Sequence, residues 1–317
     1  MLPQCLVLCN TRELATQITD EFQRFAKYLP KAKCCTLIGK VPINVQIKQL
    51  KQKDSPIVIG TLGRVADLVK RKELDLSNLQ FLVIDEADNL FMNEDNKDSL
   101  AEIIAAKPRD TQTMIFSATF CEQAKKESEA VLREGFREIT VDDNQLILHG
   151  LVQVYFELQE AEKLQKVIEL LKLNYTQAVV FTSHISRAKV LAEYLNENGI
   201  DCKHFVGKMN NKEREDLYRQ FKKKEFRVVV CTDIFQRGVD FEGVNMVIHF
   251  DMPQDTDSYL HRSGRAGRFE TNGLVVSFVA SDEDKKTLAD IQERFAVKIE
   301  QVKSVEEIET DRAFLAK

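Results

Sequence analysis

Residues 81–88 read FLVIDEAD, four apolar residues followed at once by three acids within four positions. A short run of branched and aromatic side chains is typical of a buried β-strand. Similar runs recur along the chain, separated by segments of helical period such as Leu14–Phe25 and Val190–Leu195. The predicted strands are 5–9, 34–38, 57–59, 81–84, 114–116, 138–141, 152–158, 178–181, 203–206, 227–231, 246–250 and 274–279. This alternation predicts an α/β fold of parallel sheets with helices on both faces.

The chain has 317 residues, a length that predicts about two domains. The alternation of strands and helices is interrupted once, by the polar stretch 142–145. We therefore expect a first domain at 1–141, a linker at 142–150 and a second domain at 151–317, with a short charged tail from residue 304.

Composition excludes several classes of protein. With 44% hydrophobic and 30% charged residues, the chain is typical of a soluble globular protein and not of a disordered one. Its net charge of −5 argues against a surface that is basic throughout, although a local basic cleft remains compatible with it. We expect no membrane segment and no secretory signal. Seven cysteines without a CxxC pair indicate free thiols in a reducing compartment.

The acids after the 81–84 strand are the first candidate site. Ligands of parallel sheets bind beyond the carboxyl ends of the strands. Two adjacent carboxylates at such an end suit a nucleotide hydrolase, in which Asp85 would hold Mg²⁺ and Glu86 would polarise the attacking water. The alternative is that these acids only favour the start of the following helix.

Ser117, Ala118 and Thr119 follow the predicted strand 114–116. Their two hydroxyls could bond to the carboxylates of the neighbouring strand end and so couple the two segments. The alternative is an ordinary helix cap before Phe120.

The stretch HRSGRAGR, residues 261–268, concentrates positive charge between glycines. Arg262, Arg265 and Arg268 could converge on a small anion and stabilise a phosphoryl group during transfer. A solvated basic turn is the alternative. Upstream, Gly238 permits close backbone approach and Asp240 could hold a ribose hydroxyl.

Several further strand ends suit a sugar–phosphate backbone, because a hydroxyl and helix N–H groups meet there. No aromatic platform accompanies them, so we predict backbone contact with little sequence preference. Each could alternatively be a simple helix cap. The residues are Thr11, Arg12, Thr61, Gly63, Arg64 and Thr182.

Together, these motifs resemble those of the DEAD-box RNA helicases in order and spacing. The resemblance implies two RecA-like domains that close over ATP and grip single-stranded RNA. It implies that Arg265 and Arg268 are arginine fingers and that His261 links their segment to the DEAD segment. It also implies that the 117–119 segment couples hydrolysis to RNA release.

The resemblance implies further contacts as well. Gly238, Asp240 and Arg262 would contact ATP, whereas Arg214 and Thr232 would contact RNA. The stretches 148–151, 251–253 with 258–262, and 290–295 resemble the branch that acts in nuclear pre-mRNA splicing and mRNA export, the helicase subunit of the TREX complex. That branch implies a nuclear monomer with protein partners of splicing and export assemblies, the cytoplasm being the alternative location.

One family element does not occur in this sequence. No G-x-x-x-x-G-K-[ST] phosphate loop is found in it,. We therefore expect an N-terminally truncated first domain that lacks a central strand. Two hypotheses follow: an ATP-dependent RNA helicase represented by a fragment, or an ATPase-dead paralogue that binds RNA or protein.

Overall fold

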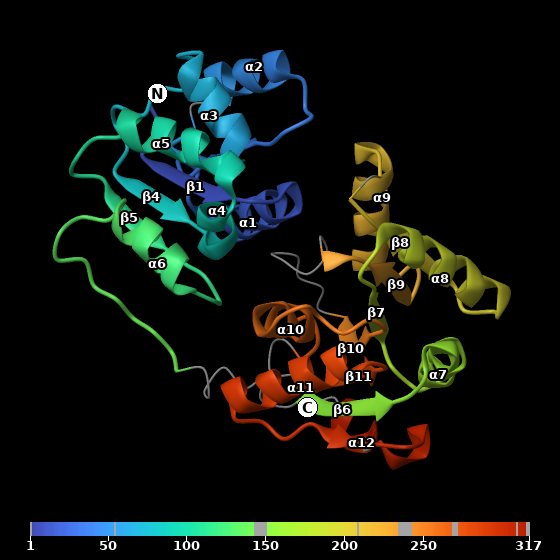
Figure 1. Cartoon of the computed structure of the whole chain (residues 1–317). Helices are drawn as coiled ribbons and strands as arrows, with labels where there is room; N and C mark the ends of the chain where they lie inside the picture. The colour runs from blue at the N-terminus through green and yellow to red at the C-terminus, as the bar shows by residue number, and fades with distance from the viewer. Residues whose placement is uncertain are drawn as a thin grey trace. The chain divides into compact units, whose positions relative to one another are not determined.

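The computed structural model describes residues 2–53, 55–142, 151–207, 209–233, 243–267, 272–308 and 310–314. It divides into two compact units, Met1–Glu138 and Ile139–Lys317. Each unit is built on one parallel sheet flanked by helices (Figure 1), as the sequence predicts.

The first unit holds a five-stranded sheet of order β2-β3-β1-β4-β5. Its strands are β1 (Cys5–Cys9), β2 (Cys34–Leu37), β3 (Ile57–Thr61), β4 (Phe81–Ile84) and β5 (Gln112–Ile115). Its helices are α1 (Arg12–Phe25), η1 (Ala26–Tyr28), α2 (Ile43–Lys53), α3 (Leu62–Lys70), α4 (Ala87–Met92), η2 (Glu94–Asn96), α5 (Lys97–Ala106) and α6 (Glu122–Glu129).

Alternation along β1 shows how this sheet is covered on both faces. Leu6 and Leu8 pack into a cluster with residues of α3, α5 and α6. Val7 and Cys9 point to the opposite face, where they pack with residues of α1. Because successive side chains of a strand point to opposite faces, one apolar run supplies both cores.

The strands of the first sheet follow one another without a gap. β1 pairs with β3 on one side and with β4 on the other, and β4 pairs with β5. Within the described sheet, β5 pairs on one side only, so the absence of a further strand stays a prediction.

The second unit holds a seven-stranded sheet of order β12-β6-β11-β10-β7-β9-β8. Its strands are β6 (Leu151–Glu157), β7 (Gln177–Phe181), β8 (Cys202–Phe205), β9 (Val228–Cys231), β10 (Val244–His249), β11 (Gly273–Val279) and β12 (Glu300–Gln301). Its helices are η4 (Glu160–Glu162), α7 (Lys163–Leu170), α8 (Ile185–Glu197), α9 (Asn211–Lys222), α10 (Thr256–Ser263), α11 (Asp282–Phe295), η6 (Val305–Glu307) and α12 (Thr310–Phe314).

Two sequence predictions are wrong. Residues 138–141 form no strand, and Ile139 and Val141 are exposed, because no neighbouring strand pairs with them in the described structure. The segment from residue 304 is more than a charged tail. Ile308 and Ala313 are buried in the core of the second unit, so apolar burial anchors the helices η6 and α12.

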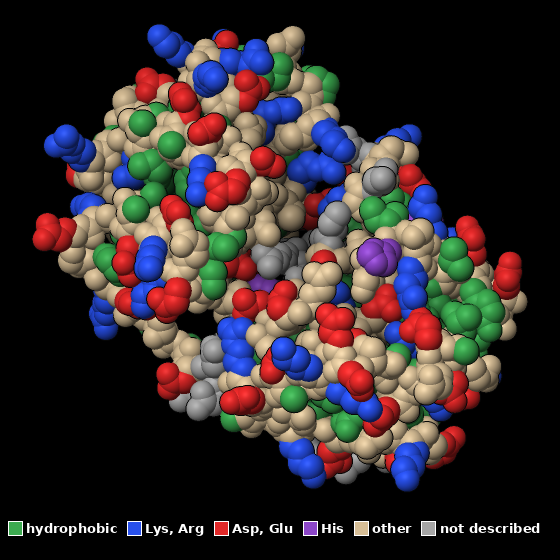
Figure 2. Space-filling view, in the orientation of Figure 1, with side chains coloured by type: hydrophobic (Ala, Val, Ile, Leu, Met, Phe, Trp, Pro, Cys, Tyr) green, Lys and Arg blue, Asp and Glu red, His purple; other side chains and the backbone are tan. Residues whose placement is uncertain are grey.

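The surface carries charges of both signs (Figure 2), and the cysteines form no disulfide. Lys and Arg side chains are interspersed with Asp and Glu on the face shown in Figure 2. All seven cysteines are free. Within the described residues, no helix is long and apolar enough to cross a membrane, and no cluster of three or more His, Cys, Asp or Glu side chains could hold a metal.

Candidate functional site

The carboxyl ends of β1, β4 and β5 are joined by backbone hydrogen bonds. The Asp85 N–H donates to the Leu8 carbonyl over 2.9 Å, and the Ala87 N–H donates to the Phe116 carbonyl over 3.1 Å. The acidic segment after β4 is therefore held between the ends of its two neighbouring strands. This position is where the sequence pattern predicted a ligand edge.

Asp85 and Glu86 stand at the centre of that edge. Asp85 Oδ1 accepts a hydrogen bond from the Glu86 N–H over 3.0 Å. Burial, and then the neighbouring Glu86 carboxylate, raise the pKa of Asp85 above its ordinary value,. Glu86 adopts a left-handed backbone with φ 53°, which is uncommon for a residue other than glycine. Its Oε2 is buried and has no hydrogen-bond partner among the described residues, so this oxygen is available to a ligand or water.

The 117–119 segment bonds to the last acid of the motif. Ser117 Oγ donates to Asp88 Oδ1 over 2.9 Å, and Thr119 Oγ1 donates to Asp88 Oδ2 over 3.2 Å. The Asp88 N–H in turn donates to Ser117 Oγ over 3.3 Å. Asp88 is only 7% exposed. The predicted contact between hydroxyls and carboxylates is present, with Asp88 as the acceptor.

Thr11 lies between β1 and α1, and Thr61 is the last residue of β3, directly before α3. Thr11 Oγ1 accepts from the Leu14 N–H over 3.2 Å and caps α1, as the simpler interpretation predicts. Arg12 is the first residue of α1. Thr61 Oγ1 instead accepts from the Gly39 N–H over 3.3 Å, which ties the end of β3 to the loop after β2.

Gly63 and Arg64 lie in the first turn of α3. A Cβ placed on Gly63 would meet no atom within 4 Å, so packing does not require a glycine there and the space above it is open. Arg64 donates to the Val41 carbonyl over 2.8 Å and also to Gln46 Oε1. Its guanidinium therefore orders the loop that precedes α2.

In the second unit, Arg262 of α10 is 1% exposed. Its Nε donates to Asp233 Oδ1 over 2.6 Å, and its Nη1 donates to the Asp251 carbonyl over 2.9 Å. The guanidinium lies over the Phe181 ring. Arg262 thus holds α10 against the ends of β7, β9 and β10, so its guanidinium has a structural role.

His261 and Arg265 accompany it. They are 4% and 5% exposed, respectively, and Arg265 Nε donates to the His261 carbonyl over 3.1 Å. A solvated basic turn is therefore the wrong interpretation for these two residues and for Arg262. Gly238, Asp240 and Arg268 lie outside the described residues.

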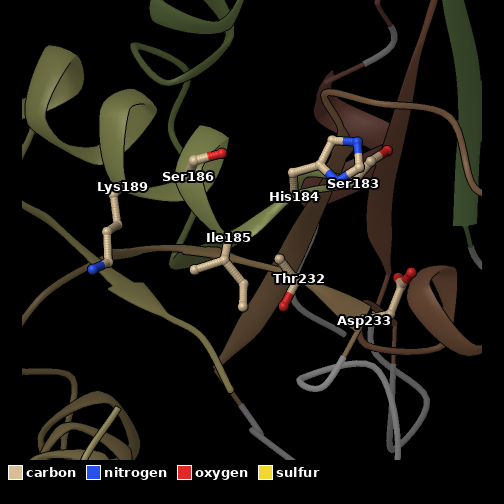
Figure 3. Close-up of a pocket in the computed structure, with 7 residues that line it drawn as sticks. All are labelled: Ser183, His184, Ile185, Ser186, Lys189, Thr232 and Asp233. Atoms are coloured by element: carbon tan, nitrogen blue, oxygen red, sulfur yellow. The ribbon is translucent and has the colours of Figure 1, made fainter. Parts of the chain in front are cut away.

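A hollow of about 750 Å³ lies at the carboxyl ends of β7 and β9. Figure 3 shows the side chains that line it, which come from the segment after β7, the first turns of α8 and the segment after β9. Helix N–H groups, hydroxyls and one lysine suit a phosphate. The lining residues are Ser183, His184, Ile185, Ser186, Lys189, Thr232 and Asp233.

The remaining candidates of the second unit lie on buried positions. Thr182 is 0% exposed, and its hydroxyl donates to the Cys231 carbonyl over 3.3 Å, so it joins β7 to β9. Arg214 of α9 is 8% exposed and lies over the Phe205 ring.

Sequence reasoning missed three polar residues of these edges. Asp88 was part of the quoted motif but was given no role. Asn10 directly follows β1, and its Oδ1 is buried without a partner among the described residues. Lys189 lines the hollow from α8. For Asn10, its place immediately after an apolar strand was the available signal.

Family models match both units. Residues 2–127 match the DEAD/DEAH box helicase model, and residues 162–270 match the helicase conserved C-terminal domain. The chain is 43% identical over 295 residues to the ATP-dependent RNA helicase SUB2 of Coccidioides immitis and 42% identical over 297 residues to SUB2 of Saccharomyces cerevisiae. These alignments cover 92% and 93% of this chain and 67% of each relative, so the chain spans about two thirds of their length.

Solved structures agree with this assignment. Saccharomyces cerevisiae Dbp5 bound to RNA and ADP BeF3 is similar with a TM-score of 0.88 and 27% identity, over 96% of this chain and 78% of that one. A Dbp5 bound to Gle1 and IP6 matches with a TM-score of 0.79 and 28% identity, over 98% of this chain and 78% of that one. With both units matched and the motifs at their strand ends, the chain belongs to the DEAD-box family of ATP-dependent RNA helicases.

Proposed function

We propose that this protein is an RNA-stimulated ATPase that remodels RNA or RNA–protein complexes during pre-mRNA splicing and mRNA export. It would act in the nucleus, as a monomer that is recruited by protein partners of those assemblies. The proposal is supported by the resemblance of its motifs to the splicing and export branch and by its identity to the SUB2 helicases.

The observation that carries the proposal is the acidic edge of the first unit. Mg²⁺ is usually held by one or two carboxylates together with substrate phosphates and water. Asp85 and Glu86 place two adjacent carboxylates at the strand end, and Glu86 Oε2 has no partner among the described residues, so they fit that arrangement. When bound with ATP, Mg²⁺ supplies positive charge that offsets the charge of the phosphates.

The chain's own residues would hold the metal, activate the water and stabilise the transferred phosphoryl group. Asp85 would hold the metal, and Glu86 would orient the attacking water and accept its proton at Oε2. Arg265 and Arg268 would stabilise charge on the transferred phosphoryl group. His261 and Arg262 would position that segment, and Gly238 and Asp240 would face the nucleotide.

Binding of RNA would use the strand ends of both units. The hollow at Ser183, Lys189 and Thr232 offers helix N–H groups, hydroxyls and a cation to one phosphate,. In the first unit, the open space at Gly63 would admit a second phosphate. These contacts read no base, so little sequence preference is expected. Thr11, Arg12, Thr61, Arg64, Thr182 and Arg214 would support this surface.

The experiment compares the wild type with a Glu86→Gln variant, both expressed from the complete natural transcript. Oligo-U RNA should raise phosphate release from ATP by the wild type. Glu86→Gln should lower kcat by about 10²-fold or more, while RNA binding measured by fluorescence anisotropy is retained. Glu102→Gln, on the exposed face of α5, is the control and should leave both unchanged.

Two results would overturn the proposal. Phosphate release that is unchanged in Glu86→Gln would remove the role given to Glu86. RNA binding by the wild type without any ATP turnover would instead identify an RNA- or protein-binding paralogue.

A further inference from the structure

The end of α1 carries an exposed apolar cluster that the proposed function does not use. Phe25, Tyr28 and Leu29 are 73%, 83% and 61% exposed. Two of the three are aromatic, and aromatic side chains are enriched where proteins bind one another. We call these three residues the α1-end patch.

The backbone under the α1-end patch is ordered by local hydrogen bonds. After α1 ends at Phe25, η1 spans Ala26–Tyr28. The Leu29 N–H donates to the Ala26 carbonyl over 2.8 Å. Pro30 then fixes its own φ and disfavours a helical Leu29, which has φ −118° and ψ 79°. The three side chains are thus presented on a preorganised turn, which lowers the entropic cost of binding.

Two exposed lysines, Lys27 and Lys31, flank the α1-end patch, whereas Arg24 is paired with Glu21 over 2.6 Å. Arg24 lies over the Phe25 ring at 4.3 Å, and the Lys27 Nζ lies over the Tyr28 ring at 5.3 Å. Lys31 follows directly after the turn and is exposed. Neither Lys27 nor Lys31 has an acidic partner within the described residues, so their charges are available to a negatively charged ligand.

The α1-end patch lies far from the edge that is proposed to bind RNA. Helix α1 contains 14 residues and rises about 1.5 Å per residue, so the patch is about 21 Å from Thr11 at the other end of the helix. A ligand at this end therefore need not displace RNA from the strand ends.

Protein is a better match to this patch than RNA. A base stacks on an open ring face, and because a cation covers one face of each ring, at most one face of each remains for stacking. The Leu29 side chain can neither stack on a base nor bond to a phosphate. An aliphatic residue beside two aromatics is instead suited to contact an apolar anchor of a protein partner. Charge complementarity then requires that the partner be acidic around its anchors.

We propose that the α1-end patch is a docking site for an acidic protein segment that carries aromatic or leucine anchors. The apolar side chains would bury the anchors, and Lys27 and Lys31 would attract the acidic residues beside them. Because exposed charges are screened by salt, affinity should fall as ionic strength rises.

The probe for this proposal is a phage-displayed library of 16-residue peptides, panned on the 317-residue chain. Enriched peptides should be acidic and should carry aromatic or leucine residues. An enriched peptide, synthesised with a fluorophore, should bind a Tyr28→Ala/Leu29→Ala variant at least about tenfold more weakly. Lys27→Glu/Lys31→Glu should weaken binding similarly and reduce its salt dependence.

Matched controls lie elsewhere on the surface. Val190→Ala removes an apolar side chain that is 64% exposed on α8, and Lys126→Glu reverses an exposed charge on α6. Both should bind the peptide as the wild type does. Oligo-U binding should be unchanged in the patch variants, which separates this site from the proposed RNA surface.

Three results would overturn the proposal. The first is the absence of acidic sequences among the enriched peptides. The second is equal binding of the peptide to the wild type and to the patch variants. The third is competition between oligo-U RNA and the peptide together with loss of RNA binding in the patch variants, which would identify a nucleic-acid surface.

Discussion

Removal of the two hydroxyls that bond to Asp88 is the most direct test of how the first unit is held together. Ser117→Ala and Thr119→Val delete both donors while leaving side chains of nearly the same size. Asp88 would then stay buried, at 7% exposed, without the bonds of 2.9 and 3.2 Å to its two oxygens.

The expected cost follows from these contacts. A hydrogen bond to a charged group contributes about 1.5–3 kcal/mol, and an unsatisfied buried carboxylate adds to that cost. We take the lower end for each bond, because Asp88 retains other polar contacts. The double variant should therefore lose about 3 kcal/mol of unfolding free energy. For a domain of this size, that is a fall in Tm of at least about 6 °C.

The assay is thermal unfolding followed by circular dichroism, together with duplex unwinding and ATP turnover. Unwinding should fall more than ATP turnover does, because the hydroxyls touch Asp88 and not Asp85 or Glu86. The control is Thr16→Val/Ser77→Ala, since the Thr16 hydroxyl donates to the Arg12 carbonyl at an exposed position and Ser77 is exposed. A Tm within about 2 °C of the wild type, which corresponds to roughly half a kcal/mol, would refute the assigned network.

Three further outcomes are expected. Asp85→Asn should stabilise the first unit at neutral pH. The folded pKa of Asp85 is raised, so its ionisation lowers the unfolding free energy. That loss is absent below the ordinary pKa, near pH 4, and grows as pH rises through the raised pKa. Equal pH–stability curves of wild type and variant would contradict this. Burial, and then Arg262, lower the pKa of His249. As pH falls below the ordinary pKa of histidine, the second unit should therefore lose up to about 1.4 kcal/mol of unfolding free energy per pH unit. Urea unfolding of His249→Asn should show no such slope. Arg262→Lys should cost about 2 kcal/mol, because an ammonium cannot serve the Asp233 carboxylate and the Asp251 carbonyl with the same geometry. An unchanged urea midpoint would count against that assignment.

The order of elements was predictable because each buried strand is a short apolar run between polar ends. The runs at β1, β7 and β9 need no context to be recognised, since both faces of these strands are covered. Residues 138–141 show the limit of this reasoning. Ile139 and Val141 alternate with polar residues as in a strand, yet both are exposed, because strand formation also needs a neighbour to pair with.

The candidate site was predictable in position but not in its contacts. That the 117–119 hydroxyls meet an acid follows from the adjacency of two parallel strands. Which acid they meet depends on the left-handed turn at Glu86, which redirects the chain and brings Asp88 to the hydroxyls. Burial of Arg262 was likewise not predictable, because its partners Asp233 and Asp251 lie 29 and 11 residues away in the sequence and on other elements.

The ion pair between Arg262 and Asp233 has an electrostatic consequence for the hollow beside it. Asp233 lines that hollow and would repel an incoming phosphate if its charge were uncompensated. With Arg262 at 2.6 Å, the carboxylate presents little net charge, and Lys189 sets the local sign. A small shift of α10 that lengthened this pair would leave the hollow less attractive to anions, so the arginine segment could control the release of an anion without any movement of the strands.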